Sequence, residues 1–249
     1  MTHKKKLLII SISVGLAVAL AITLITLAFT VWKQPSKTTQ EWLNDFKNCI
    51  VVEKDASEQK NHKSITITED GNTVALYEHL VEIKNQNDEK IAHLSVKEEF
   101  PTLETDEFDT YDEYYFIDGI MYMQRIAAGE TNGTSFGSTW EVFWEVVTEN
   151  LGSANYNFAE SNFTDLLLTH NKHTHSMSAT ISDSNKYKFF AGAEGIADMS
   201  RINVAMTFND ETGYYDLKIG YTYKDKQSVE ISISRTEPTD IEIKDFVQR

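Results

Sequence analysis

The sequence predicts an α+β domain, in which a few helices pack against a large and mainly antiparallel β-sheet, preceded by one transmembrane helix. Apolar and polar residues alternate with a period of two, typical of strands, from residue 64 onward. Two segments, around residues 42 and 144, instead repeat apolar residues at the period of an amphipathic helix. Helices segregated against an antiparallel sheet make an α+β domain.

The transmembrane helix is predicted from the amino-terminal segment. Three lysines in residues 1–6 precede an uncharged run, residues 7–32. A spanning helix needs about 20 apolar residues, whereas the apolar region of a cleavable signal has about 7 to 15. The length of the run, and the lack of a small-x-small cleavage site at its end, favour an uncleaved signal anchor over a cleaved signal. Both remain open at this point.

The lysines also predict the orientation of the chain in the membrane. Positive charge near a spanning helix stays on the cytoplasmic side. Residues 1–6 are therefore the expected cytoplasmic tail, residues 33–38 a linker, and residues 39–249 an extracytoplasmic domain of a single-pass cell-membrane protein.

Composition excludes some functions. The formal net charge is −15, and the three tail lysines do not offset the acidity of the outer domain. Such a surface repels phosphate backbones, so nucleic acid is not an expected partner. Cys49 is the only cysteine, which rules out an intramolecular disulfide. A domain of this length can bury enough apolar surface without one.

The first helix after the membrane segment is expected to begin near Ser36 or Thr38, either of which can cap it. Its apolar face consists of Trp42, Leu43, Phe46, Cys49 and Ile50. Residues 139–151 predict a second helix with an aromatic stripe, and residues 162–168 a shorter one capped by Asn162. The polar stretch 53–63 is expected to be a loop.

About eight or more strands are expected. They are residues 64–68, 73–83, 91–100, 172–182, 187–190, 202–208, 215–223 and 229–233, together with the hairpin EYYFIDGIMYMQR at 113–125. In that hairpin Asp118 and Gly119 are the central residues of a predicted type I′ turn. This register places Ile117, Ile120, Tyr115 and Tyr122 on one face, and Phe116, Met121, Tyr114 and Met123 on the other. Both faces are apolar, which raises the question of what covers the second one.

The order of these elements resembles the LolA-like superfamily of bacterial envelope carriers, which includes the periplasmic lipoprotein carrier and the mycobacterial LppX-LprG-like lipoproteins. The resemblance rests on the helix EWLNDFKNCI, the hairpin YYFIDGIMYMQR, the central helical insertion and the late strands from YYDLKIGYTY onward, and it spans most of residues 40–246. It implies a curved sheet that forms an open half-barrel, with the helices on one face and an apolar cavity between them for acyl chains. The chain lacks the lipid-attachment cysteine of the lipoprotein members, so a tethered module is expected rather than a shuttling carrier.

The resemblance implies an apolar ligand site between the hairpin and the central helix. Its candidate lining residues are Tyr114, Phe116, Met121, Met123, Trp140, Phe143 and Trp144. The alternative is that the aromatic residues of the helix simply pack into the core, because apolar residues at helical spacing usually signal burial.

Two motifs are minor candidates for metal binding. In HNKHTHSM, His173, His175 and Met177 share one face of a strand, a ligand set that suits copper or zinc. The plainer interpretation is a partly exposed strand end. The acidic cluster Asp106, Glu107, Asp109, Asp112 and Glu113 could bind calcium, but it lacks the spacing of an EF-hand loop and is more simply a solvated loop.

Neither a nucleophile elbow nor a phosphate-binding glycine loop occurs in the sequence. We therefore expect a protein that is not an enzyme and has no cofactor. The leading hypothesis is a membrane-anchored module that binds a lipid or another apolar ligand. The alternative is a cell-surface interaction or structural domain without a cavity, and the space between helices and sheet distinguishes the two. The sequence identifies no protein partner.

Overall fold

The computed structural model describes residues 37–86, 89–103, 106–151, 156–191, 193, 195–224 and 226–247. The chain divides into two units, and the fold reported below is that of the second, Thr39–Arg249. The predicted transmembrane segment 7–32 and its basic tail lie outside the described residues. Within the described residues, no helix has the length and hydropathy needed to cross a membrane.

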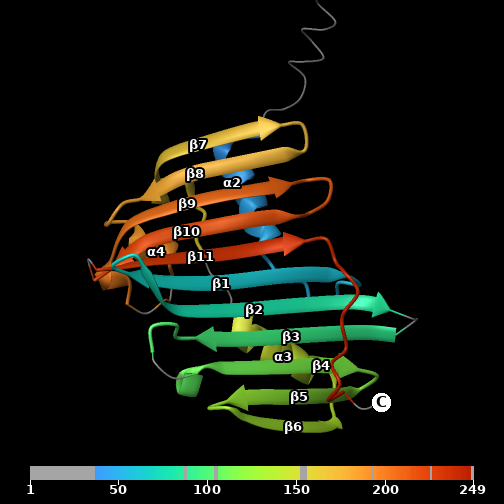
Figure 1. Ribbon diagram of the computed structural model, residues 1–249. Coiled ribbons are helices and arrows are strands. Elements are labelled where there is room, and N and C mark those ends of the chain that lie inside the picture. The colour runs from blue at the N-terminus through green and yellow to red at the C-terminus, as the bar shows by residue number, and fades with distance from the viewer. Residues whose placement is uncertain are drawn as a thin grey trace, which may run out of the picture. The chain divides into compact units, whose positions relative to one another are not determined.

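In the described part of the chain, eleven strands form one open sheet in which every neighbouring pair is antiparallel (Figure 1). Their order is β6-β5-β4-β3-β2-β1-β11-β10-β9-β8-β7. The strands are β1 Gln59–Glu69, β2 Asn72–Gln86, β3 Glu89–Glu99, β4 Thr110–Ile117, β5 Ile120–Ala127, β6 Glu130–Gly137, β7 Phe163–Asn171, β8 Thr174–Ile181, β9 Met199–Asn209, β10 Tyr215–Tyr223 and β11 Gln227–Thr236. The chain thus enters at the middle of the sheet, runs to the β6 edge, crosses to the β7 edge and returns until β11 pairs with β1. The predicted antiparallel α+β architecture is confirmed.

Two helices, α2 Thr39–Cys49 and α3 Trp140–Leu151, lie on the same face of the sheet (Figure 1). Leu43 and Phe46 of α2 are fully buried in a core with residues of β8 to β11. Phe143 and Val147 of α3 are equally buried in a second core over β2 to β5. The apolar stripes predicted for both helices therefore face the sheet, each over its own half.

The predicted hairpin is confirmed as β4 and β5. Asp118 and Gly119 have φ angles of +48° and +73°, as a type I′ turn requires. Phe116 pairs with Met121 and Tyr115 with Tyr122, the predicted register. The face of the hairpin that carries Phe116 and Met121 packs against α3.

The C-terminal segment covers the second apolar face of the hairpin. It passes over the side of the sheet away from the helices (Figure 1, red), and Ile241 and Val247 are buried against Tyr115, Ile117 and Tyr122. The Tyr115 hydroxyl donates a hydrogen bond of 2.9 Å to the Glu242 carbonyl oxygen.

Three secondary-structure predictions are wrong. Residues 162–168 do not form a helix: Asn162 ends a short 3-10 turn, and strand β7 begins at Phe163 and pairs with β8. Residues 187–190, predicted as a strand, belong largely to the short helix α4 Lys186–Phe189, whose Phe189 is buried in the α2 core. The predicted loop 53–63 contains the start of β1 at Gln59. In each case pairing or burial against residues distant in sequence overrides the local pattern.

Candidate functional site

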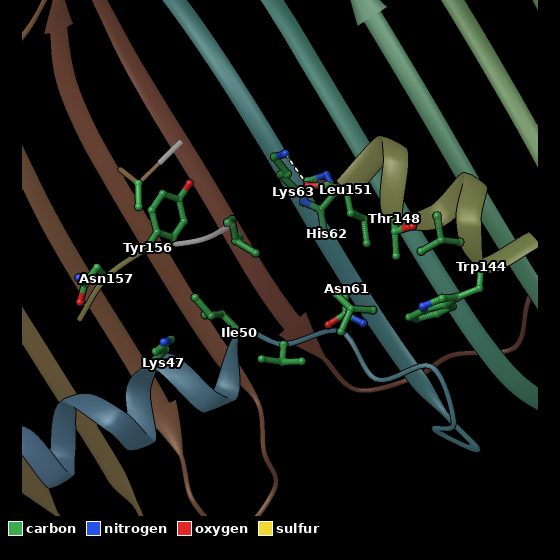
Figure 2. Close-up of a pocket in the computed structure, with 15 residues that line it drawn as sticks. Lys47, Ile50, Asn61, His62, Lys63, Trp144, Thr148, Leu151, Tyr156 and Asn157 are labelled. Carbon is green, nitrogen blue, oxygen red and sulfur yellow. Dashed lines mark hydrogen bonds between the residues drawn. The ribbon is translucent and has the colours of Figure 1, made fainter. Parts of the chain in front are cut away.

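A cavity of about 690 Å³ opens on the helix-covered face of the sheet, between α2 and α3 (Figure 2). Its volume falls within the range of about 300–1,000 Å³ that is typical of small-molecule sites. The residues that line it are Lys47, Ile50, Val51, Val52, Asn61, His62, Lys63, Trp144, Val147, Thr148, Leu151, Tyr156, Asn157, Ala191 and Ile233. Most of them are apolar, and the polar ones cluster on β1 and at the ends of the cavity.

The cavity exists because the two helices cover different halves of the sheet. The α2 core lies over β8 to β11 and the α3 core over β2 to β5, so the central strand β1 lies between them. Alternate residues of a strand face opposite sides of the sheet. Asn61 and Lys63 face the helices and line the cavity. His62 belongs to the other face, where its Nε2 lies 3.7 Å from an oxygen of Glu78.

Polar side chains flank the cavity floor across the neighbouring strands. Asn61 pairs with Arg235 of β11, and Lys63 pairs with His79 of β2. Arg235 donates through Nε to Asn61 Oδ1 at 3.1 Å and through a second nitrogen to the Val51 carbonyl at 2.6 Å. These polar residues lie where the α2 core and the α3 core adjoin.

Lys63 connects the cavity floor to the end of α3. Its Nζ donates to the carbonyl oxygen of Leu151 at 2.6 Å, where the last turn of the helix leaves that oxygen without an intrahelical donor. Burial lowers the pKa of Lys63 and, together with the nearby Lys63 charge, that of His79. The lysine therefore has a structural role and also presents donors to the cavity.

The structure places the seven predicted ligand residues in one cluster, but not around the cavity. Met121 and Phe143 are buried under α3, and Tyr114, Phe116, Met123, Trp140 and Trp144 pack around them. Ring centroids of Trp140 lie 5.5 Å from Phe143 and 5.9 Å from Trp144. Of the seven, Trp144 alone lines the cavity. The other six fill the core between α3 and the hairpin.

Sequence reasoning missed Asn61 and Lys63, because they lie in the polar stretch that was expected to be a loop. The segment QKNHK has no apolar alternation, and its β-structure depends on pairing with both β2 and β11. A signal was nevertheless present, because this stretch directly precedes the period-two pattern that begins at residue 64.

The histidine motif forms a hydrogen-bonded cluster. His175 and Met177 are buried on β8, whereas His173 is half-buried in the preceding turn. His173 and His175 each contact one oxygen of Asp210, at 3.0 and 3.1 Å, and hydrogen bonds from His175 and His173 lower the pKa of that carboxyl. Trp42 stacks on His170 with centroids 4.0 Å apart, which attaches α2 to this edge of the sheet. Across the described part of the chain, no group of three or more His, Cys, Asp or Glu side chains is arranged to hold a metal ion.

The acidic side chains of the predicted calcium cluster likewise contact separate partners. Asp109 accepts a hydrogen bond from the Phe100 amide at 2.9 Å, and Asp112 lies 3.6 Å from Arg125. Glu113 contacts His93 and Lys244 on the face covered by the C-terminal segment.

No protein-family model matches the chain, and no curated protein is significantly similar to it.

Proposed function

We propose that the chain is a membrane-anchored, extracytoplasmic binding module whose cavity between α2 and α3 holds a lipid or another apolar ligand. The observation that carries this proposal is the cavity of about 690 Å³ with its apolar walls. An interior filled completely by side chains would have favoured the rival function. The role is binding, without catalysis.

A LolA-like form is part of the same proposal. The open antiparallel sheet, with both helices on one face and a cavity between them, supports it. So does the amino-terminal apolar run, which would tether the domain to the outer side of the membrane. A tethered module would receive or present its ligand at one membrane.

Native mass spectrometry of the full chain, purified from its own membranes, tests the proposal. We expect a co-purifying lipid mass on the wild-type protein. Thr148→Trp, which places an indole in the cavity from an exposed position on α3, should lose it. Thr131→Trp, on the exposed strand β6, is the matched control and should retain it. A wild-type protein that is free of lipid, under conditions that preserve the lipid of a known carrier, would contradict the proposal.

The second candidate is a cell-surface interaction or structural domain that needs no ligand. The observation that favours it is the filled core under α3, where six of the seven predicted ligand residues pack against one another. Under this function the wild type, Thr148→Trp and Thr131→Trp would all be free of bound lipid.

A further inference from the structure

The charge of the cavity is opposite to that of the chain. The protein carries 38 acidic and 23 Lys or Arg residues, yet none of the described residues that line the cavity is Asp or Glu. Lys47 and Lys63 do line it, at the α2 side and on the floor (Figure 2). A cleft that carries one sign of charge between low-dielectric walls attracts ligands of the other sign.

Lys63 has capacity for an anion. Its ammonium group has three donors, and one of them is directed to the Leu151 carbonyl. No carboxylate of the described residues lies within ion-pair distance of its Nζ, whereas Lys60, three positions earlier and on the other face of β1, pairs with Glu82 at 3.0 Å. The positive charge of Lys63 is therefore not neutralised by the residues described around it.

Asn61 supplies a second donor on the same face. Its side chain is 1% exposed, and its Oδ1 accepts from Arg235. Its Nδ2 has no acceptor among the described residues. A buried donor without an acceptor costs about 1–3 kcal/mol. Two residues along a strand correspond to about 7 Å, so Asn61 and Lys63 form one short polar strip.

The remaining wall of the cavity is apolar, with Ile50 and Val52 after α2, Trp144 and Leu151 on α3, and Ile233 on β11. Building on the proposed function, we propose that the ligand is a single-chain amphiphile with an anionic head group. The head group binds at Lys63 and Asn61, and the chain lies along the apolar wall. A carboxylate and a phosphate share this chemistry.

Photolabelling of the full chain in phosphatidylcholine nanodiscs tests the ligand class. The probes are palmitate, hexadecyl phosphate and neutral hexadecanol, each with the same diazirine in the chain, and mass spectrometry quantifies probe attached to cavity peptides. Comparing variants with the same probe removes differences in partition into the bilayer. Lys63→Met should raise the half-maximal concentration of an anionic probe about tenfold and leave that of hexadecanol unchanged. Lys218→Met, at an exposed lysine of β10, should change neither.

The outcomes separate this inference from the proposed function. If all three probes label the wild-type cavity equally and Lys63→Met has no effect, the anionic head group is wrong and apolar binding stands. If no probe labels cavity peptides, both fail. If Lys63→Met also abolishes labelling by hexadecanol, the cavity has collapsed, and the Lys63→Arg variant decides. If Lys63→Arg is still labelled better by the anionic probes than by hexadecanol, the inference is supported. If it is labelled equally by all three probes, the inference is overturned. The relative labelling by palmitate and hexadecyl phosphate identifies the head group.

Discussion

Replacing His93 with glutamine tests the buried ionic network beneath the C-terminal segment. The His93 ring lies between two carboxylates, with Nδ1 3.1 Å from Glu82 and Nε2 2.5 Å from Glu113. Lys60 lies 3.0 Å from Glu82, and Lys244 lies 2.9 Å from Glu113. Lys244 belongs to the C-terminal segment, so the network connects that segment to β2, β3 and β4.

The pKa shifts indicate that His93 is charged in the folded protein. Burial disfavours the imidazolium, but Glu113 and Glu82 outweigh it and raise the pKa of His93. Burial also opposes ionisation of both carboxyls. Hydrogen bonds from His93 and the lysines outweigh it and lower the pKa of Glu82 and of Glu113.

The expected loss follows from removing one member of a buried ionic group, which costs about 3–5 kcal/mol. Because Lys60 and Lys244 still neutralise the two carboxylates, we expect His93→Gln to lower the free energy of unfolding by about 3 kcal/mol. For a domain of this size, that corresponds to a fall in Tm of about 6–12 °C.

The pH dependence distinguishes an ionic role from a packing role. A raised folded pKa means that the His93 charge stabilises fully below the unfolded pKa of about 6.5, and that this stability is lost as the pH rises through the folded pKa. The lowered pKa values of the two carboxyls act in the opposite sense. Their contribution to stability is present above the unfolded pKa of about 4.3 and is lost as the pH falls through the folded pKa values. The difference in Tm between wild type and His93→Gln should therefore be largest at about pH 5 to 6.5 and shrink at alkaline pH.

Thermal unfolding followed by near-ultraviolet circular dichroism, over a pH series from about 5 to 10, measures this difference. His173→Gln is the control, because His173 is only half-buried and contacts an exposed Asp210, and it should change Tm little at any pH. An equal loss of Tm at every pH would show that His93 acts through packing, and no loss at any pH would show that the network is not stabilising.

Three further predictions concern stability and reactivity. Gly119→Ala should lower the free energy of unfolding in urea by about 1–3 kcal/mol, because φ is +73° at that turn. Gly137→Ala is the control and should be nearly neutral, because Gly137 has no positive φ. Equal losses in the two variants would contradict the turn argument. Phe143→Ala should lower the free energy of unfolding by about 3–5 kcal/mol in the same measurement, because the side chain is fully buried. Val142 is its exposed neighbour, and Val142→Ala should change that free energy by no more than about 0.5 kcal/mol. Similar losses in the two variants would refute burial of the α3 stripe. Burial raises the pKa of Cys49 to about 11, so iodoacetamide should modify it slowly at neutral pH and rapidly in urea, and rapid modification of the native protein would contradict its burial.

The β4–β5 hairpin was predictable to the level of individual residue pairs. Its turn depends on Asp118 and Gly119, which tolerate positive φ, and a two-residue turn determines the register of every pair that follows. The apolar stripes of α2 and α3 were predictable for the same reason, since helical periodicity is local. Short segments were less predictable. Leu166 and Leu168 favour a helix intrinsically, but β7 gains the hydrogen bonds of an edge strand by pairing with β8.

The candidate site was predictable only in part. Sequence reasoning placed the ligand between the hairpin and the aromatic helix, and that space is occupied by the side chains themselves, such as Phe116 against Phe143 at 5.9 Å. The cavity lies over β1, three strands from β4 in the sheet, and Trp144 is the one predicted residue that lines it. Side-chain volumes and the distance between two helices are properties of the packed structure, and no periodicity reports them.

The sequence by itself determined the class of fold, the main strands, the two amphipathic helices and the acidic character of the surface, because propensity, turn chemistry and alternation act between near neighbours. Only the tertiary structure decided that the polar segment at Asn61 becomes the central strand, that the C-terminal segment covers the second face of the hairpin, and that a cavity with a basic floor separates two cores. These features depend on contacts such as that of Asn61 with Arg235, between residues far apart along the chain.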